Sequence, residues 1–241
     1  MPSKIRLDHL LTQKNMVQSR SQAENLINLG LVEVEGKIIK KAGYFINEQA
    51  KIKLLIDEKY VSRAALKLAS VAKILKLNFK DKIVLDVGSS TGGFSDFALH
   101  RGAKKSICIE VGTNQLHPSL KNNPNIELHE QTDIRDVKKL SSMPNVVLID
   151  VSFISLKLVL PAIAKLVNKN TEIVAMLKPQ FEAGESIKNK GVIKNERMRR
   201  NIMKDFENYV MKSFVIIDKC DSSISGAKGN TERFYLLKTT H

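Results

Sequence analysis

Four charged residues, far apart in the chain, occupy positions that call for a chemical reason. They are Lys67 in SRAALKL, Asp150 in IDVSFISL, Lys178 in MLKPQFE and Glu232 in GNTERF. A lysine that ends an apolar strand is poorly explained by stability, because burial disfavours its charged form. Asp150 and Lys178 should emerge at the same edge of a sheet. Taken together, the four residues indicate a functional site rather than a structural role.

A glycine-rich segment, VLDVGSSTGGF from Val84 to Phe94, is a second candidate site. The pattern predicts a strand ending near Asp86, a tight turn at Gly88 and a helix that begins at Gly92-Gly93. In doubly wound sheets, ligands bind at such turns. A dinucleotide fingerprint would read G-x-G-x-x-G, whereas this segment reads G-x-x-x-G-G, and Asp86 would repel a pyrophosphate. The acid suits a cationic ligand, so we favour S-adenosylmethionine (SAM) over a nicotinamide cofactor.

Two further acids are placed as a nucleoside ligand would require. Glu110 ends the next expected strand, 24 residues after Asp86. A carboxylate there can accept hydrogen bonds from both hydroxyls of a ribose. Asp133 follows the third expected strand, where an adenine amino group could be recognised. We therefore expect both acids in the cofactor site.

The elements that must position these residues alternate between apolar strands and helices. Strands are expected at 83–87, 106–110, 126–130, 145–150, 172–177, 214–219 and 233–238, and helices at 67–75, 93–100, 155–166 and 196–212. Continuous apolar strands that alternate with helices are typical of a parallel sheet covered on both faces. We predict an α/β fold with a Rossmann-like sheet, mostly parallel with one antiparallel strand.

Residues 1–59 are expected to form a separate small α+β unit. Helical apolar faces run over 6–11 and 20–29, and Gly30 stands where a helix would stop. Alternating polarity around Glu35-Gly36 then predicts a strand–turn–strand. We assign 60–66 to a short linker and 67–241 to the larger domain, and the absence of proline and glycine from the junction predicts an ordered connection.

The strings RLDHLL and SRSQAENLINLGLVEVEGK and the pair Lys40-Lys41 lie in the small unit. Together they resemble the RNA-binding module first known from a small-subunit ribosomal protein. The resemblance implies that the second helix and its neighbouring loops lie along structured RNA. The basic positions that match the module are Lys4, Arg6, Arg20, Lys40 and Lys41.

Five strings of the larger domain, YVSRAALKL, DVGSSTGGF, DVSFISL, KPQFE and SGAKGNTERF, resemble the TlyA family of ribose 2′-O-methyltransferases, within the wider FtsJ-like group. The resemblance implies SAM-dependent methylation of a cytidine ribose in large-subunit ribosomal RNA, and in some members also the small subunit. It implies a catalytic tetrad of Lys67, Asp150, Lys178 and Glu232. The matching cofactor positions are Asp86, Gly88, Ser90, Gly92, Gly93, Glu110, Asp133 and Asp150.

Lys178 is the residue that we expect at the centre of the reaction. A ribose 2′-hydroxyl is a weak nucleophile that must lose its proton. A neutral lysine would act as a general base, and a charged lysine would orient the hydroxyl and stabilise developing negative charge. A nearby Lys67 favours the neutral form and nearby carboxylates favour the charged form, so the sequence leaves both open. The mechanism requires no metal.

A strongly basic segment follows the Lys178 strand. Residues 188–204 contain seven basic residues and one acid, Glu196. The basic residues are Lys188, Lys190, Lys194, Arg197, Arg199, Arg200 and Lys204. We expect RNA-phosphate contacts from this segment, with Lys188, Arg197 and Arg200 as the candidates.

The overall charge indicates a polyanionic partner, either nucleic acid or an anionic membrane. Lys and Arg number 39 against 25 Asp and Glu, a net charge of +14. The partners implied by the resemblance are ribosomal RNA and ribosomal subunits. No apolar run reaches the length of a membrane span, the first ten residues lack the apolar core of a signal peptide, and Cys108 and Cys220 have no metal-like spacing. We expect a cytoplasmic monomer without metal. The alternatives are a membrane-active, haemolysin-like protein and an RNA-binding protein whose catalytic domain has decayed.

Overall fold

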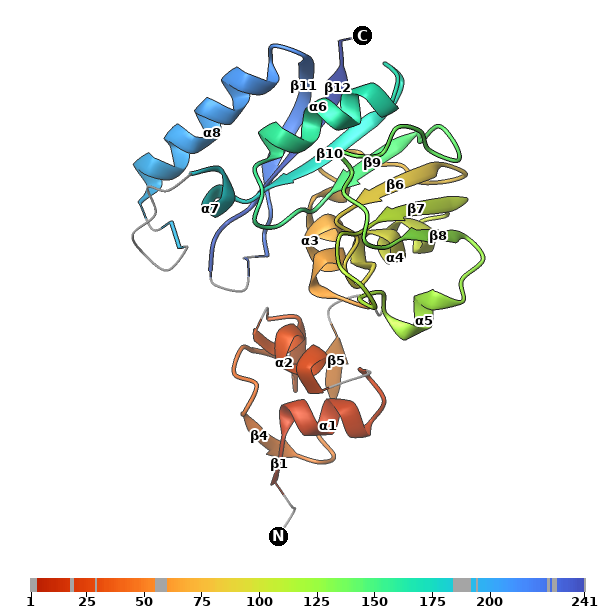
Figure 1. Cartoon of the computed structure of the whole chain (residues 1–241). Helices are drawn as coiled ribbons and strands as arrows, with labels where there is room; N and C mark the ends of the chain where they lie inside the picture. The colour runs from red at the N-terminus through yellow and green to blue at the C-terminus, as the bar shows by residue number, and fades with distance from the viewer. Residues whose placement is uncertain are drawn as a thin grey trace. The chain divides into compact units, whose positions relative to one another are not determined.

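The computed structural model describes residues 4–17, 20–28, 30–54, 60–183, 192–193, 195–224, 226 and 229–240 (Figure 1). The chain divides into two compact units, 1–63 and 64–241. The junction was expected over residues 57–67, and its first three residues, 57–59, lie outside the described residues.

The small unit combines two helices with short antiparallel strands, in agreement with the predicted α+β module. Its elements are β1 (Lys4–Arg6), α1 (Leu7–Gln13), α2 (Arg20–Asn28), β2 (Val32–Val34), β3 (Lys37–Ile39), β4 (Phe45–Asn47) and β5 (Ile52–Leu54). β2 pairs with both β3 and β5, and β1 pairs with β4. The predicted strand–turn–strand is the β2–β3 hairpin, where Glu35 and Gly36 both have positive φ.

The large unit is built on one seven-stranded sheet with the order β11-β12-β10-β9-β6-β7-β8. Only β12 runs antiparallel to its neighbours, β10 and β11, which confirms the expected mostly parallel sheet with one antiparallel strand. The strands are β6 (Ile83–Val87), β7 (Lys105–Ile109), β8 (Ile126–His129), β9 (Val146–Ile149), β10 (Glu172–Leu177), β11 (Phe214–Asp221) and β12 (Arg233–Thr239).

Helices cover both faces of this sheet (Figure 1). They are α3 (Arg63–Ala72), α4 (Gly93–His100), α5 (Pro118–Lys121), α6 (Leu156–Leu166), α7 (Pro179–Glu182) and α8 (Glu196–Val210). α6 and α8 share one apolar core with alternate residues of the strands, such as Leu85, Val147 and Tyr235. The other face carries α3 and α4, and Phe94 of α4 contacts Phe234 of β12 with ring centroids 6.1 Å apart.

The observed elements differ from the predicted ones mainly at short segments. α3 begins at Arg63, four residues before the predicted start at Lys67. Residues 57–66 contain no proline, the residue type that often marks the first turn of a helix. No helix among the described residues is long and apolar enough to cross a membrane.

Candidate active site

The strand order reverses between β6 and β9, and the backbone there requires glycine. Gly88, directly after β6, has a φ of +78°, and a Cβ on it would lie 2.7 Å from the carbonyl oxygen of Asp150. β6 leads into α4 on one face of the sheet, whereas β9 leads into α6 on the other. A crevice opens at such a switch point, and it is the usual ligand site of doubly wound sheets.

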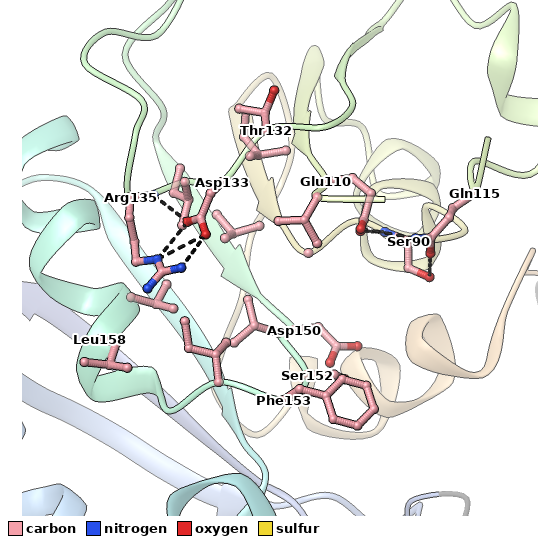
Figure 2. Close-up of a pocket in the computed structure, with 18 residues that line it drawn as sticks. Ser90, Glu110, Gln115, Thr132, Asp133, Arg135, Asp150, Ser152, Phe153 and Leu158 are labelled. Carbon is pink, nitrogen blue, oxygen red and sulfur yellow. Dashed lines mark hydrogen bonds and ion pairs between the residues drawn. The ribbon is translucent and has the colours of Figure 1, made fainter. Parts of the chain in front are cut away.

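A cavity of about 680 Å³, here called the edge cavity, lies at this switch point (Figure 2). Five of the eight expected cofactor positions line it: Gly88, Ser90, Glu110, Asp133 and Asp150. Apolar side chains contribute much of the remaining wall: Ile109, Val111, Ile134, Ile154, Leu158 and Val159. The volume and the mixed lining are typical of a small-molecule site.

Asp86, Gly92 and Gly93 are outside this lining, as far as the described residues define it. Gly92 has a φ of +86° and is packed against leucine side chains at the start of α4. Asp86 is buried, and its Oδ2 accepts hydrogen bonds from the backbone nitrogen (2.9 Å) and the hydroxyl (2.6 Å) of Ser95. Its Oδ1 has no hydrogen-bond partner among the described residues. Asp86, Gly92 and Gly93 therefore support the conformation of the glycine turn without lining the edge cavity.

Burial changes the acidity of Asp86. Loss of hydration raises the pKa of its carboxyl to about 7, and the negative charges of Asp150 and Glu110 act in the same direction. The hydrogen bonds from Ser95 oppose the shift. An acid with a pKa near 7 beside a ligand turn is a candidate partner for a cation.

Glu110 is fixed at one wall of the edge cavity by three donors (Figure 2). The backbone nitrogens of Ser90 and Gly112 each donate to its carboxylate at 2.8 Å, and the side-chain nitrogen of Gln115 donates at 3.3 Å. A carboxylate offers about four acceptor sites. Glu110 is thus a preorganised acceptor with room for one more hydroxyl.

Asp133 lies at the opposite wall, in an ion pair that the sequence did not predict (Figure 2). The Arg135 side chain donates to both Asp133 oxygens, with a shortest contact of 2.6 Å, and its backbone nitrogen donates at 2.9 Å. The hydrogen bonds from Arg135 lower the pKa of Asp133 below its usual value. Asp133 is therefore an ionised acceptor whose position depends on Arg135.

Asp150 and Lys178 form the first half of the expected tetrad. In the sheet ladder Ile149 pairs with Ala175, so both residues follow neighbouring strand ends at one edge. The Lys178 ammonium lies 2.5 Å from Asp150 Oδ1 and donates to the Ser152 hydroxyl at 2.8 Å. The Lys178 side chain is 11% exposed, so its charge lies beside the edge cavity with little access to water.

Lys67 and Glu232 form the second half. The Lys67 ammonium lies 2.6 Å from Glu232 Oε2, and the two side chains are 11% and 3% exposed. Leu177 pairs with Arg233 at the end of the β10–β12 ladder, so Lys178 and Glu232 are the next positions beyond it. The structure thus brings the four residues, here called the tetrad, to one sheet edge as two ion pairs.

The loop after β9 carries an exposed aromatic residue that the sequence did not single out. Phe153 is 91% exposed, has a φ of +64° and lines the edge cavity (Figure 2). Its ring centroid lies 5.1 Å from that of Phe181, whose ring centroid is 6.0 Å from the Lys178 ammonium. A large apolar side chain held in solvent beside a charged site offers a stacking surface for a planar ligand. The available signal was a phenylalanine in the loop after an expected strand, between Ser152 and Ile154.

A partly buried acid holds this loop in place. Glu182 accepts hydrogen bonds from the Ser155 hydroxyl at 2.5 Å and from the Leu156 backbone nitrogen at 2.7 Å. Burial raises the pKa of Glu182. Since Ser155 caps α6 and Glu182 belongs to α7, this contact joins the two segments that carry Asp150 and Lys178.

The expected RNA-contacting residues of the small unit lie at its surface to different degrees. Lys4, Lys40 and Lys41 are exposed, and so is Arg20, whereas Arg6 is partly buried. Surface lysines are suited to phosphate contacts.

In the basic segment of the large unit, the helix α8 exposes some basic side chains and buries another. Arg197, Arg200 and Lys204 are exposed at helical spacing, whereas Arg199 is buried and paired with Asp221 at 2.8 Å. Arg199 therefore has a structural partner and does not belong to a phosphate-binding face. Lys188, Lys190 and Lys194 lie outside the described residues.

The geometry defines what this edge can do chemically. An ammonium group fixed between a carboxylate and a hydroxyl, beside a cavity, can orient a substrate hydroxyl. It can also stabilise the negative charge that develops on the hydroxyl oxygen as the proton is lost. No group of three or more His, Cys, Asp or Glu side chains in the described ranges could hold a metal ion.

Two family models match the chain. The model of the FtsJ-like methyltransferase matches residues 60–239, and the model of the S4 domain matches residues 5–52.

Curated relatives and solved structures are similar over much of the chain. The 23S rRNA (cytidine-2′-O)-methyltransferase TlyA of Campylobacter jejuni is 44% identical over 184 residues, which cover 75% of this chain and 72% of the relative. The 16S/23S rRNA (cytidine-2′-O)-methyltransferase TlyA of Mycobacterium tuberculosis is 31% identical, covering 99% and 91%. A solved structure of a candidate hemolysin from Streptococcus thermophilus has a TM-score of 0.73 and 34% identity, covering 100% of this chain and 90% of that one.

Proposed function

Because the chain belongs to the TlyA family of FtsJ-like methyltransferases with an S4 domain, we propose that it transfers a methyl group from SAM to the 2′-hydroxyl of a cytidine ribose in ribosomal RNA. The observation that carries this proposal is the Lys178 ammonium held by Asp150 and Ser152 beside the edge cavity. Large-subunit RNA is the proposed substrate, since the relative with 44% identity is a 23S rRNA methyltransferase.

The edge cavity fits SAM in size and in the chemistry of its walls. Glu110 would accept a hydrogen bond from one ribose hydroxyl, and Asp133 would accept one from the adenine amine. The apolar side chains between them would cover the adenine ring. Asp86, with one buried oxygen still unpaired among the described residues, would face a cationic group through the glycine turn. Gly88 and Ser90, on the glycine turn, complete the lining of the edge cavity on this side.

Bound SAM supplies an electrophilic methyl group, and the protein must supply a positioned and activated hydroxyl. Lys178 is placed to hold the 2′-oxygen and to stabilise the negative charge that develops as the hydroxyl proton passes to water. The oxygen–methyl bond would form as the methyl–sulfur bond breaks. Asp150 and Ser152 fix the ammonium so that its position costs no reorganisation during the reaction. The Lys67–Glu232 pair supports the same edge from the neighbouring strand and α3.

A similar solved structure is named a hemolysin, so the alternative function to compare is membrane activity. None of the contacts in the described site calls for a lipid. Two partly buried ammonium–carboxylate pairs at a sheet edge are instead suited to proton-coupled chemistry on a hydroxyl. We therefore propose the methyltransferase function alone.

Lys178→Ala tests the proposal. We expect a loss of at least about 100-fold in tritium-methyl transfer from labelled SAM to unmodified ribosomal RNA, with SAM binding retained in calorimetry. Lys82→Ala is the matched control. Lys82 also forms a partly buried pair, with Glu172 at 2.9 Å, but it precedes β6 and so lies at the opposite edge of the sheet. Retained turnover in Lys178→Ala would remove this residue from the proposed role.

Mapping of 2′-O-methyl groups identifies the substrate. Ribosomal RNA from cells with and without the gene would be compared nucleotide by nucleotide. We expect the difference at a cytidine of the large subunit. A difference confined to the small subunit would contradict that assignment.

A further inference from the structure

A fully buried carboxylate holds two of the arginines that were expected to contact RNA. Asp8, in the first turn of α1, has no exposed surface. Its Oδ1 accepts from Arg6 Nε at 3.0 Å, and its Oδ2 accepts from Arg6 Nη2 at 2.7 Å and from Arg20 Nε at 3.0 Å. Two guanidinium groups thus share one carboxylate.

The arrangement fixes the planes of the guanidinium groups as well as their charges. The contact between Arg6 and Asp8 is bidentate, a geometry that restricts the fork to one plane. The guanidinium also lies beside Gly43: its carbon and both terminal nitrogens are each 3.6 Å from the point that a Cβ on Gly43 would occupy. Both arginines remain accessible, with side chains that are 37% and 48% exposed.

Guanidinium N–H groups that Asp8 leaves unoccupied make this cluster suited to an anion. Among the described residues, Asp8 occupies two N–H groups of Arg6 and one of Arg20, although each guanidinium carries five. The hydrogen bond from Arg6, with help from Arg20, holds the pKa of the Asp8 carboxyl well below its usual range. Asp8 therefore stays ionised at physiological pH and prevents two neighbouring cations from moving apart.

Glu24 approaches the same arginines in a different way. Its Oε1 lies 4.0 Å from Arg6 and 3.8 Å from Arg20, and its side chain is 45% exposed. Such contacts are ion pairs without hydrogen bonds, and they restrict the guanidinium orientation little. Glu24 is consequently a carboxylate near the cluster that does not position it.

We propose that Asp8 is a positioning residue that holds Arg6 and Arg20 as a preformed clamp for the phosphates of the ribosomal RNA substrate. This inference rests on the proposed function and adds to it the residue that organises binding. The clamp recognises the RNA backbone, so it contributes affinity without base specificity.

Substitution of Asp8 by Asn separates positioning from net charge, because the two effects have opposite signs. Removal of a negative charge near phosphates would by itself tighten RNA binding. In the clamp, however, an amide has an oxygen at one end and a donor NH₂ group at the other. Either orientation places the NH₂ group against an arginine donor, so at least one arginine is released.

The test measures the Kd of the full chain for unmodified large-subunit rRNA at several KCl concentrations, with the KM and kcat of methyl transfer. For Asp8→Asn we expect Kd and KM to rise about tenfold and the salt slope to fall by about 1, with kcat unchanged at saturating RNA. Glu24→Gln, the matched control, should bind as the unaltered protein does or more tightly. A folded Asp8→Asn protein that binds RNA equally well or better would overturn the clamp.

A second variant tests the clamp if thermal unfolding shows that the Asp8→Asn protein is not folded. Arg20→Lys keeps the charge on a half-exposed side chain but removes the fork that meets Asp8. Weaker RNA binding by this variant supports the clamp, and unchanged binding overturns it. If the unaltered chain neither binds nor methylates rRNA, the proposed function fails and the clamp with it. If it does both and the variants are unaffected, the clamp alone fails.

Discussion

Asp86 couples the folding of the large unit to pH. Its folded-state pKa of about 7 lies above the ordinary value of 3.8, so between these values the folded protein binds a proton that the unfolded chain has released. The contribution of Asp86 to stability is therefore greatest at low pH and is lost as the pH rises to about 7. At roughly 1.4 kcal/mol per pH unit, the loss amounts to about 4 kcal/mol at most.

Comparison with Asp86→Asn isolates this effect from the other carboxyl groups. The variant keeps the shape of the side chain but does not titrate. We expect the free energy of unfolding of the unaltered protein, relative to the variant, to fall between about pH 4 and 7 and to level off above. Urea unfolding in that range provides the measurement. A difference that is constant with pH would show that Asp86 is ionised throughout.

At the scale of single residues, the sequence predicted the members of the site better than their partners. Lysine at the end of an apolar strand marked Lys178 as exceptional, and the structure places it with Asp150. Which lysine pairs with which acid depends on strand register, and no local pattern encodes it. The same limit explains Arg199: it was counted among the basic residues of 188–204, but in the structure it pairs with Asp221 of β11.

Gly88 controls how closely β6 and β9 approach each other at the switch point. Substitution by Ala would place a Cβ 2.7 Å from a backbone oxygen and would force an L-residue to adopt a φ of +78°. We expect Gly88→Ala to lower the free energy of unfolding by about 2–5 kcal/mol, from backbone strain and overpacking together. SAM binding should weaken as well, because the displaced strand end carries Asp150. Urea unfolding and calorimetry measure the two effects.

Gly102→Ala provides the matched control in the same unit. Gly102 has a φ of +88°, but the nearest atom to its added Cβ is 3.5 Å away, an ordinary contact. We expect Gly102→Ala to lower the free energy of unfolding by about 1–2 kcal/mol, from backbone strain alone. SAM binding should be unaffected. Equal effects of the two substitutions would contradict the steric argument at the switch point.

At the scale of elements, buried strands were the most predictable part. The apolar runs at 83–87 and 172–177 match β6 and β10 residue for residue, since a strand covered on both faces carries a continuous signal. The pairing of β1 with β4 was not foreseen. Three-residue strands have too little pattern of their own, and the pairing of Lys4–Arg6 with Phe45–Asn47 arises from tertiary contacts.

At the scale of the whole molecule, the excess of positive charge is shared between two units with separate cores. Lys4, Lys40 and Lys41 are exposed on the small unit, and Arg197 and Arg200 on the large one. The change in sequence pattern after the junction led us to expect units at 1–59 and 67–241, whereas the helix α3 already begins at Arg63. Two units that each bind the same RNA strengthen binding through their linkage.

Removal of the small unit tests that linkage. A fragment of residues 60–241 retains the whole sheet, the edge cavity and the tetrad, so we expect it to bind SAM with the affinity of the full chain. Its KM for ribosomal RNA should rise by about 100-fold or more, because the fragment loses the avidity of a second module. Adding residues 1–59 as a separate peptide should not restore the KM, since the effect depends on the covalent connection. Thermal unfolding verifies that the fragment is folded, and an unchanged KM would assign RNA recognition to the large unit alone.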